Sequence, residues 1–311
     1  MIDVSVILPA YNAARFIRRA VDSALAQDGV SVEVIAVNDA SKDDTLAVLR
    51  ELAQTRPGLR VLDNAANLGP GGTRNAGIAA AQGRWIAILD ADDAFAPGRL
   101  ARLVSVAEGQ GAGIVADLPV FYDMAAGQAA RTQLPASGAV QEVRQADFLE
   151  PDSATGLDFG LLKPMFRADL RDRWHYAEGV RHGEDFELYF DLTGQGERFL
   201  LLHEALYVFS TRIGEISGSF SPGSVTDVDY RGIAAQSRRL AARADLDAGM
   251  RELLAVREAN ALRANRRYGW TALRKRDKAR LFAWLKRDPA NRRDMLAMVM
   301  AKLRGHRGLP D

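Results

Sequence analysis

Trp85–Asp93 reads WIAILDADD, and this stretch decides the fold class of the chain. Its first five residues are apolar and include two β-branched isoleucines, which is typical of a strand buried on both faces of a parallel sheet. Three carboxylates follow at the point where that strand should end. Ligands of open α/β sheets bind outside the carboxyl ends of the strands. The stretch therefore predicts an α/β protein with an acidic site at one strand end.

The first two carboxylates of this site, Asp90 and Asp92, point to the same side of an extended chain. Paired hard oxygen donors suit Mg²⁺ or Mn²⁺ bound together with a diphosphate. An acidic turn that caps a helix starting near Pro97 is the alternative. The Asp-x-Asp spacing also occurs at 227–229 and 245–247, so spacing alone does not distinguish the two. The apolar strand in front of Asp90 favours the ligand site.

Strands and helices alternate on the amino-terminal side of this stretch. Strands are expected at 4–8, 32–37 and 59–62, and helices at 16–25, 41–52 and 73–82. Ser41–Asp44 resembles a capping box with Asp in place of Glu, and Asn67–Gly72 is expected to be a loop. A β-α-β-α-β-α-β order with short links predicts a parallel sheet with right-handed crossovers.

The composition is that of an ordinary globular protein, with 48% hydrophobic and 26% charged residues in 311. Zero cysteines exclude disulfides and thiolate metal sites and fit a reducing compartment. Met1–Asp3 leads directly into a strand, so no signal peptide is expected. No apolar run approaches the roughly 18 residues that a membrane span requires.

The net charge of +1 hides a strong asymmetry along the chain. Residues 251–311 hold 17 Lys and Arg against 6 Asp and Glu, a net charge of +11. The preceding 250 residues hold 24 against 34, a net charge of −10. The pattern past about Pro222 is helical, with three amphipathic helices marked around 253–262, 281–285 and 296–303. The basic tail is therefore expected to differ in kind from the body.

Polar residues follow each of the four expected strands. They are Tyr11 and Asn12, then Asp39, then Asn67–Asn75, then Asp90 and Asp92. Taken singly, Asn12 and Asp39 could be turn formers and the glycines a flexible link. Because the carboxyl ends of parallel strands meet at one edge of a sheet, these residues are expected to converge on one ligand.

Five motifs carry a resemblance to a known family: Pro9-Ala10-Tyr11-Asn12, Val37–Asp43, Asn67–Gly77, Asp90-Ala91-Asp92-Asp93 and Gly183-Glu184-Asp185. In order and spacing they are similar to those of family 2 glycosyltransferases, in particular bacterial exopolysaccharide and glycolipid glycosyltransferases. The resemblance implies the GT-A fold, a Rossmann-like, mostly parallel α/β sheet flanked by helices, here with a helical C-terminal extension. It implies a glycosyltransferase domain at 1–222, with its nucleotide-binding half at 1–100 and its acceptor half at 101–222. A basic helical region follows at 223–311.

The resemblance also assigns residues to a UDP-sugar donor. Those that would bind the nucleotide are Pro9, Tyr11, Asn12, Asp39, Arg74 and Asp90. A carboxylate at Asp39 would accept the N3–H of uracil and repel cytosine, which has a lone pair there. Asp92 would ligate Mn²⁺ or Mg²⁺ held by both phosphates. The alternative for Arg74 is a surface cation at a helix start.

Asp185 would be the general base that takes the proton of an acceptor hydroxyl in a single inverting displacement. The alternative is that the acidic residues after Gly183 stabilise the N-terminus of a helix. The two roles, general base and helix N-terminus, are compatible. Glu184, Trp174 and Arg212 are candidates for acceptor or diphosphate contacts. The alternative for Trp174 is a core position, where aromatic residues are more often found.

The implied function is transfer of sugar to a saccharide or lipid-linked acceptor in cell-surface polysaccharide or glycolipid synthesis, in the cytoplasm or at the inner face of the plasma membrane. One alternative is a sugar-nucleotide pyrophosphorylase, to whose glycine-rich loop Leu68–Arg74 is similar. That loop follows the first strand in those enzymes and the third strand here. Another alternative is a non-catalytic scaffold that binds UDP-sugar, against which intact Asp92 and Asp185 argue. The basic tail is either a solvated bundle or a surface for anionic membranes. No nucleic-acid-binding motif is present, and no such partner is expected.

Overall fold

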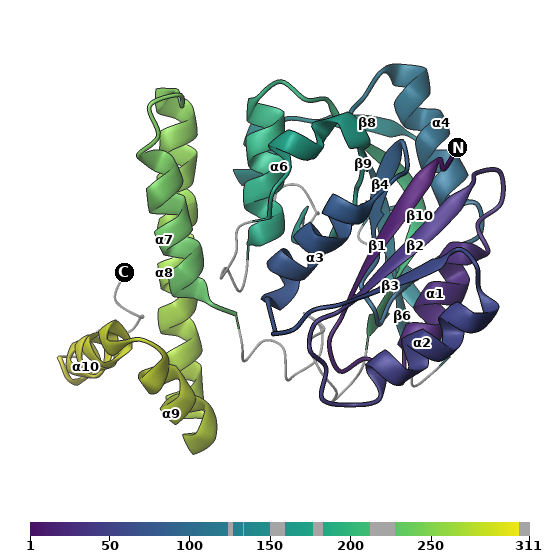
Figure 1. The fold of residues 1–311 in the computed structure, drawn as a ribbon. Coiled ribbons are helices and arrows are strands. Elements are labelled where there is room, and N and C mark those ends of the chain that lie inside the picture. The colour runs from purple at the N-terminus through teal and green to yellow at the C-terminus, as the bar shows by residue number, and fades with distance from the viewer. Residues whose placement is uncertain (124–126, 133, 150–158, 177–182, 212–227, 305–311) are drawn as a thin grey trace. The chain divides into compact units, whose positions relative to one another are not determined.

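The computed structural model describes residues 1–123, 127–132, 134–149, 159–176, 183–211 and 228–304. The chain divides into two compact units, Met1–Gly223 and Ser224–Asp311. The first unit is built on one sheet, and the second is helical in its described residues (Figure 1).

The first half of the sheet is parallel, as the sequence predicts. Its strands are β1 (Val4–Ala10), β2 (Val32–Asn38), β3 (Leu59–Asp63) and β4 (Trp85–Ile88), in the order β3-β2-β1-β4. The helices between them are α1 (Ile17–Leu25), α2 (Thr45–Thr55) and α3 (Gly69–Ala80). Figure 1 shows α3 on one face of these strands and α1 and α2 on the other. This arrangement brings the loops after β1, β2 and β4 to one edge of the sheet.

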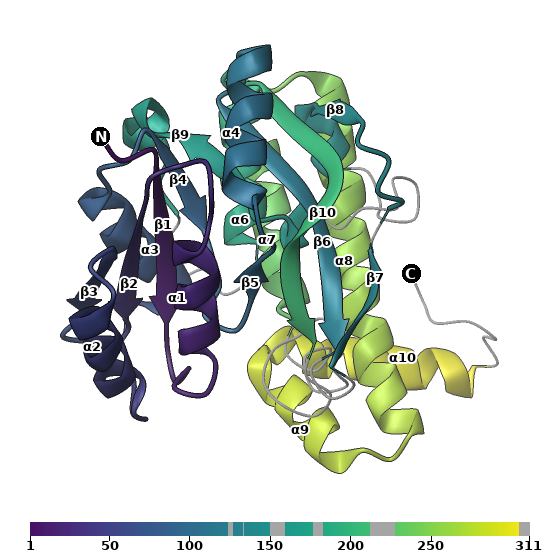
Figure 2. The ribbon, with the colours of Figure 1, turned by 90° about the vertical axis from the view of Figure 1, so that its right-hand side faces the viewer.

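The second half of the sheet is mixed. Its order continues from β4 through β9 (Met165–Arg167), β6 (Ile114–Asp123) and β10 (Phe199–Thr211) to β5 (Ala94–Phe95). Strand β9 is antiparallel to both β4 and β6, whereas β6 and β10 are parallel (Figure 2). Two short strands, β7 (Gln128–Thr132) and β8 (Val140–Val143), are antiparallel to β6 and β10. A three-residue strand therefore joins the two halves into one ten-stranded sheet.

Helices α4 (Arg99–Gln110) and α6 (Glu184–Gly194) accompany the second half, with 3₁₀ turns at Gln145–Leu149, Phe159–Leu161 and Ala168–Arg173. Their left-handed N-cap residues are Gly98 and Gly183. A glycine adopts this conformation without steric cost, so the chain turns sharply into each helix. The turn at Gly183 places Glu184 and Asp185 at the first two positions of α6.

Close packing fixes α3 against the sheet. A Cβ atom added to Gly77 would lie 2.4 Å from Cγ2 of Ile7 and 3.2 Å from Cγ2 of Val37. Only glycine therefore lets α3 approach β1 and β2 this closely. Because Arg74 lies one turn earlier on the same helix, this contact also sets the position of Arg74.

Two local predictions in this half need correction. Helix α3 begins at Gly69, inside the expected loop, with Pro70 in its first turn, where the missing N–H is tolerated. Helix α2 begins at Thr45 and has no side-chain cap bond from Asp44. Instead, Asp43 accepts hydrogen bonds from the backbone N–H of Thr45 (3.0 Å) and of Ala14 (3.2 Å). Asp43 therefore joins the loop after β1 to the start of α2.

The second unit contains four helices among its described residues, so the prediction of three omits α7. They are α7 (Tyr230–Ala241), α8 (Ala248–Arg274), α9 (Lys278–Arg287) and α10 (Pro289–Leu303). An aspartate caps each one by accepting a backbone N–H bond, and these aspartates are Asp229, Asp247, Asp277 and Asp288. The second carboxylate of each later Asp-x-Asp pair, Asp229 or Asp247, is thereby explained as a helix cap.

A polar network lies at the centre of α8, α9 and α10. The indole Nε1 of Trp284 donates to Oδ1 of Asn265 (2.9 Å), and Asn265 Nδ2 donates to Oδ1 of Asn291 (2.8 Å). Asn291 Nδ2 donates to the carbonyl of Trp284 (2.7 Å). Such a satisfied buried network specifies one packing of the three helices. No helix in the described part of the chain is both long and apolar enough to cross a membrane.

Candidate active site

A cavity of about 390 Å³ lies at the carboxyl ends of β1, β2 and β4. Its wall is formed by the chain after β1, the start of α3, Asp90–Asp93 and, from β10, Phe209. The size is in the range of small-ligand sites. The sequence-predicted residues that line it are Pro9, Tyr11, Asn12, Asp39, Arg74, Asp90 and Asp92. The structure thus brings together the residues that follow separate strands.

The loops after β1 and β2 hold each other in an unusual conformation. Asn12 and Ala40 have φ values of 51° and 53°, in the left-handed region. This conformation costs a residue with a Cβ atom roughly 1–2 kcal/mol, less for asparagine. Asn12 donates its backbone N–H to Oγ of Ser41 (3.1 Å) and accepts the N–H of Lys42 at Oδ1 (2.9 Å). These bonds offset the strain and fix Asn12 beside the cavity.

Asp39 is buried in the wall of the cavity and organises the start of α3. Its Oδ1 accepts from Nδ2 of Asn64 (3.0 Å) and the N–H of Leu68 (2.8 Å), and its Oδ2 accepts from the N–H of Gly69 (3.0 Å). A carboxylate has about four lone-pair positions, so these three bonds leave acceptor capacity. Asp39 is therefore both a structural clamp and a candidate acceptor for a ligand.

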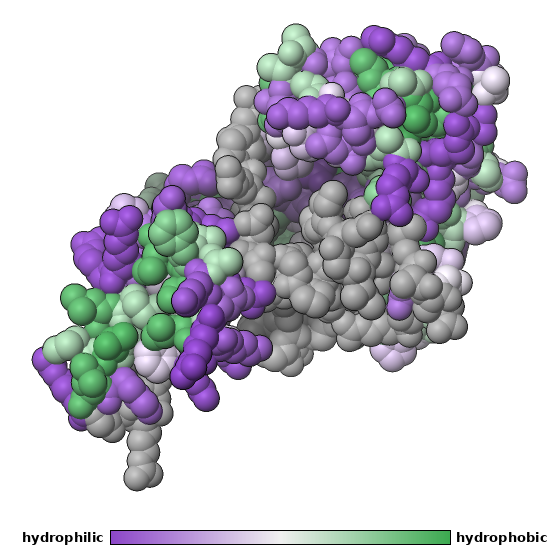
Figure 3. All heavy atoms as spheres, turned by 90° about the horizontal axis from the view of Figure 1, so that it is seen from below, coloured by the Kyte–Doolittle hydropathy of each residue, from purple (hydrophilic) through white to green (hydrophobic). Residues whose placement is uncertain are grey.

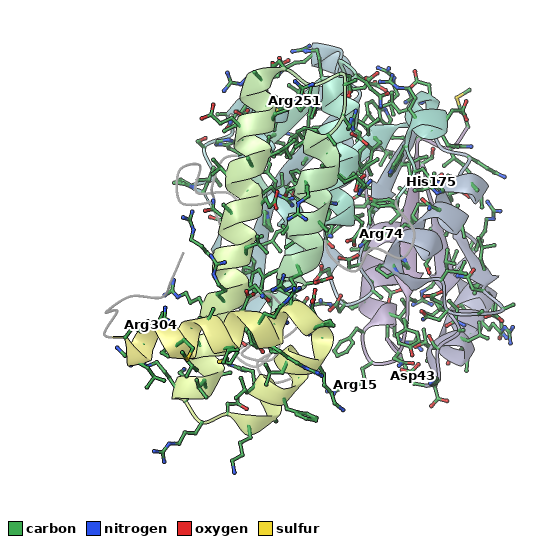
Figure 4. All side chains as sticks on the ribbon, turned by 90° about the vertical axis from the view of Figure 1, so that its left-hand side faces the viewer. Arg15, Asp43, Arg74, His175, Arg251 and Arg304 are labelled. Atoms are coloured by element: carbon green, nitrogen blue, oxygen red, sulfur yellow. The ribbon has the colours of Figure 1, made fainter. Side chains whose placement is uncertain are left out.

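Arg74 is only 4% exposed, which rules out the alternative of a surface cation. Its Nη2 lies 3.2 Å from Oδ1 of Asp90, and its Nη1 lies 3.1 Å from Oε1 of Glu184 and 3.6 Å from Oδ1 of Asp185. The guanidinium also lies 5.2 Å from the ring centre of Tyr176, within the range of a cation–π contact. Figure 4 shows Arg74 in the first unit, with the exposed His175 labelled beside it. Arg74 thus joins the carboxylate of Asp90, which follows β4, to those of α6.

A second buried cation, Lys163, completes this cluster, and the sequence reasoning missed it. Its Nζ lies 3.3 Å from Oδ2 of Asp90 and 3.2 Å from Oδ2 of Asp185. The only signal for it in the sequence is a single charge inside the otherwise apolar run Leu161–Phe166. Together with Arg74, Lys163 places two positive charges among three carboxylates.

The electrostatics of the cluster follow from burial and from these pairs. Burial acts to raise the pKa of Asp90, but Lys163 and Arg74 outweigh it and lower that pKa to about 2. Burial acts to lower the pKa of Lys163, but Asp185 and Asp90 outweigh it and raise that pKa. Burial and the neighbouring Asp185 raise the pKa of Glu184. Asp90 and Lys163 are therefore both charged at neutral pH.

Asp93 has a structural position that the sequence did not distinguish from Asp90 and Asp92. Tyr207 donates its hydroxyl to Oδ2 of Asp93 (2.7 Å), and the N–H of Ser210 donates to Oδ1 (2.8 Å). Burial and then the charges of Asp92 and Asp90 raise the pKa of Asp93 well above its ordinary value. Asp93 therefore ties the end of β4 to β10.

The carboxylates in the cavity wall suit a metal that arrives with its ligand. The described residues contain no cluster of three His, Cys, Asp or Glu side chains able to hold an ion. Mg²⁺ usually binds through one or two carboxylates together with substrate phosphates and water. Asp92, which lines the cavity two residues after Asp90, is a candidate ligand for such an ion.

Of the residues expected to contact the acceptor or the diphosphate, two are not placed at the cavity by the structure. Trp174 is 2% exposed and its ring packs 3.9 Å from that of Phe166, so the structure places it in the core and offers no face to a sugar. Arg212 lies outside the described residues. Glu184 remains at the cluster through its bond to Arg74.

Comparison with known proteins agrees with this arrangement. The family model for Glycosyl transferase family 2 matches residues 5–168. Succinoglycan biosynthesis protein ExoO of Rhizobium meliloti is 37% identical over 230 residues, covering 69% of this chain and 62% of ExoO. ExoU of the same organism is 35% identical, covering 70% of this chain and 64% of ExoU. The match thus spans less than two thirds of either relative.

A solved structure resembles the chain in fold. S. aureus TarS 1-349 in complex with UDP-GlcNAc has a TM-score of 0.64 and 21% sequence identity, covering 83% of this chain and 72% of that one. At this identity the likeness shows a shared fold.

Proposed function

The chain belongs to glycosyl transferase family 2 and has the GT-A fold, and from this premise we propose that it transfers a sugar from a UDP-sugar to an acceptor hydroxyl with inversion at the anomeric carbon. One observation carries the proposal. The cavity wall contributes Arg74 and Asp90 to an ion-pair cluster that also contains Glu184 and Asp185, so the nucleotide-binding motifs adjoin the proposed base. The acceptor would be a saccharide or a lipid-linked saccharide of a cell-surface polysaccharide or glycolipid.

The donor would bind through the residues of the cavity wall. Asp39 has acceptor capacity left for the N3–H of uracil, which cytosine lacks. Tyr11, 47% exposed at the cavity, offers an aromatic face to the base. The solved TarS complex supports a UDP-sugar donor, because that protein of the same fold binds UDP-GlcNAc.

The chemistry would be a single displacement. The acceptor oxygen forms a bond to the anomeric carbon as the bond from that carbon to the UDP oxygen breaks, and Asp185 takes the hydroxyl proton. Asp92 would hold Mn²⁺ or Mg²⁺, which when bound would neutralise the charge that grows on departing UDP. Attack from the face opposite UDP requires Asp185 on the acceptor side.

Incubation of the protein with UDP-glucose, UDP-galactose or UDP-N-acetylglucosamine and candidate acceptors tests this proposal. We expect UDP release matched by a new glycosidic bond of opposite anomeric configuration, measured by NMR. A pyrophosphorylase would instead form UTP from the donor and pyrophosphate, and a scaffold would bind the donor without turnover. An Asp185→Asn variant provides the control, since it keeps the shape of the side chain and should lose about 10² or more of the transfer rate.

We also propose that the C-terminal unit binds an anionic membrane surface at the cytoplasmic face, where lipid-linked acceptors would lie. Leu296, Met300 and Leu303 recur at helical spacing along one face of α10 and are 65%, 42% and 77% exposed. Figure 3 shows apolar side chains gathered on this unit with hydrophilic ones at their edges. Basic residues Arg292, Arg293 and Lys302 on the same helix are exposed, and so is Arg304, which follows its last residue and is labelled in Figure 4. An apolar face edged by cations suits an interface with anionic lipid better than a solvated surface.

A further inference from the structure

Four side chains form a closed ring of alternating charge beside the cavity: Asp90, Arg74, Asp185 and Lys163. Each of the two carboxylates faces Arg74 with its Oδ1 and Lys163 with its Oδ2. The four residues come from the end of β4, from α3, from α6 and from the segment between Phe159–Leu161 and β9. All four side chains are at most one quarter exposed. Their charges therefore interact in an environment that screens them weakly.

The two contacts of Asp185 in this ring are unequal. Lys163 Nζ donates a hydrogen bond to Oδ2 at 3.2 Å. Arg74 Nη1 lies 3.6 Å from Oδ1, beyond hydrogen-bonding distance. Lys163 thus holds one oxygen of Asp185 by a hydrogen bond, and the other oxygen, which accepts no hydrogen bond from Arg74, is the better placed to receive a proton.

The backbone on either side of Lys163 Cα is itself fixed by buried side chains. Nη2 of Arg99 donates to the carbonyl of Lys163 at 2.7 Å, and the hydroxyl of Tyr189 donates to the carbonyl of Leu162 at 3.2 Å. Arg99 is fully buried, pairs with Asp117 at 2.7 Å and has its guanidinium 4.4 Å from the ring centre of Phe95. Because its main chain is anchored at two consecutive carbonyls, the Lys163 ammonium occupies a defined position.

From this geometry we infer that Lys163 is a positioning residue for transfer, which holds Oδ2 of Asp185 so that Oδ1 receives the proton of the acceptor hydroxyl. The inference rests on the proposed function, in which Asp185 is the base. A side chain that only filled space at this position would need length and apolar atoms but no charge. Lys163 instead places an ammonium group between the proposed base, Asp185, and Asp90, the carboxylate on the side of the UDP-sugar. Misplacement of a reacting group by about 1 Å can cost as much as 10²-fold in rate.

The absence of cysteine from the chain allows a direct test of the ammonium group. Lys163→Cys introduces a unique thiol. The thiol is alkylated while the protein is unfolded in denaturant, and the protein is then refolded. Treatment with 2-bromoethylamine restores an ammonium group at nearly the length of lysine, and treatment with iodoacetamide gives a neutral side chain of similar size. Lys278→Cys on α9, an exposed position, receives both treatments as the handling control.

We expect the neutral form to lose roughly 10- to 100-fold in kcat. Its KM for the UDP-sugar should change by less than about threefold, and the aminoethyl form should recover most of the rate. Equal kcat for the aminoethyl and neutral forms would overturn the inference. Both Lys278→Cys products should transfer at the wild-type rate, which separates loss of charge from damage during refolding.

A second measurement keeps the inference testable if neither alkylated form refolds. Lys163→Met is made directly in the wild type and in the Asp185→Asn background, and the residual transfer rates are compared. If Lys163 acts through Asp185, the methionine substitution should cost at least tenfold in the wild type and little in the Asp185→Asn background. Equal losses in both backgrounds would show a structural role only. Absence of transfer by the wild-type protein with every donor would contradict the proposed function itself.

Discussion

Asp90 is the residue whose ionisation most directly reflects the charged cluster. Its pKa is lowered from 3.8 to about 2 by Lys163 and Arg74, against the effect of burial. A carboxyl whose folded pKa lies below its unfolded pKa contributes stability that is full above the unfolded value and is lost as the pH falls through the folded value. The pairs formed by Asp90 should therefore stabilise the protein fully above about pH 4 and progressively less toward about pH 2.

Asp90→Asn should lower the free energy of unfolding by about 2 kcal/mol at neutral pH through this effect. The difference between wild type and variant should shrink as the pH falls from about 4 to about 2, because protonated Asp90 no longer pairs with Lys163 and Arg74. Urea unfolding of both proteins across this pH range measures the difference. A difference that stays constant with pH would show that the pairs with Lys163 and Arg74 do not lower the pKa of Asp90.

Asp92 tests the metal in the proposed function. Asp92→Ala should abolish the part of UDP affinity that depends on Mn²⁺ or Mg²⁺ and leave the fold intact, because Asp92 lines the cavity outside the core. Calorimetric titration with UDP, with and without each ion, gives both affinities. Equal metal-dependent affinity in variant and wild type would remove Asp92 from the site.

At the scale of single residues, the sequence predicted the residues that line the cavity better than the residues that surround it. Tyr11, Asp39 and Asp92 each follow a strand, and strand ends converge by topology alone. Lys163 follows no strand and belongs to no motif. Its contact with Asp90 depends on the path of the chain between β6 and α6, which local pattern does not determine. Trp174 shows the reverse error, because an aromatic residue suits both a sugar site and a core.

At the scale of elements, the close contact of α3 with the sheet can be tested by a pair of glycine substitutions. Gly77→Ala should destabilise the protein by roughly 1–3 kcal/mol, because the new methyl group would clash with Ile7 and Val37. The same shift of α3 should weaken UDP binding through Arg74. Gly109→Ala in α4 is the matched control, since an added Cβ there meets no atom within 4 Å. We expect that variant to gain about 0.5–1 kcal/mol.

Thermal unfolding and UDP titration of the two variants measure these effects. Unchanged stability of Gly77→Ala would mean that α3 can move away from β1 without cost.

The presence of most helices and strands in the first half of the sheet could be predicted from the sequence, but the residues at which they begin and end were harder to predict. The apolar periodicity of α1 and the apolar runs of β1, β2 and β4 follow directly from the sequence. The start of α3 was missed because Gly69, Pro70, Gly71 and Gly72 are typical of loops, whereas packing against the sheet holds the first turn helical. The capping box expected at Ser41–Asp44 was wrong, because Ser41 Oγ accepts the N–H of Asn12 instead and α2 begins only at Thr45, whose N–H bonds to Asp43.

At the scale of the whole molecule, the proposed membrane surface predicts salt-sensitive binding to anionic liposomes. Replacing Leu296, Met300 and Leu303 together by serine should reduce co-sedimentation with such liposomes and leave UDP binding unchanged. Because the Debye length is about 8 Å at physiological ionic strength, binding by the wild type should weaken in high salt. Val256→Ser on α8, at an exposed apolar position, is the control.

Wild-type protein that ignores anionic liposomes even at low salt would contradict this proposal. Point substitutions are preferable to removing the chain from about Arg274. That truncation would also remove Trp284 and Asn291, the network partners of Asn265, and so destabilise α8.

The mixed character of the sheet was beyond sequence reasoning. Strand β9 has three residues, too few for a periodic pattern, yet it joins the parallel half to β6. Its pairing partners lie far away in the chain. Trp85 of β4 pairs with Arg167, 82 residues later, and Ile114 of β6 pairs with Phe166, 52 residues later, in a register set by the completed sheet.

This late strand has a consequence for synthesis on the ribosome. Strand β4 pairs with β1 on one side and with β9 on the other. Its partner β1 is translated before it, whereas Met165, the first residue of β9, is translated 80 residues after Trp85. At about 5–20 residues per second, the apolar edge of β4 would wait for several seconds without its neighbour. An open apolar edge is a site for pairing between chains. Slow codons between residues 100 and 165 should therefore lower the soluble yield, and the same codons placed after residue 230 should not, as measured by fractionating newly made protein.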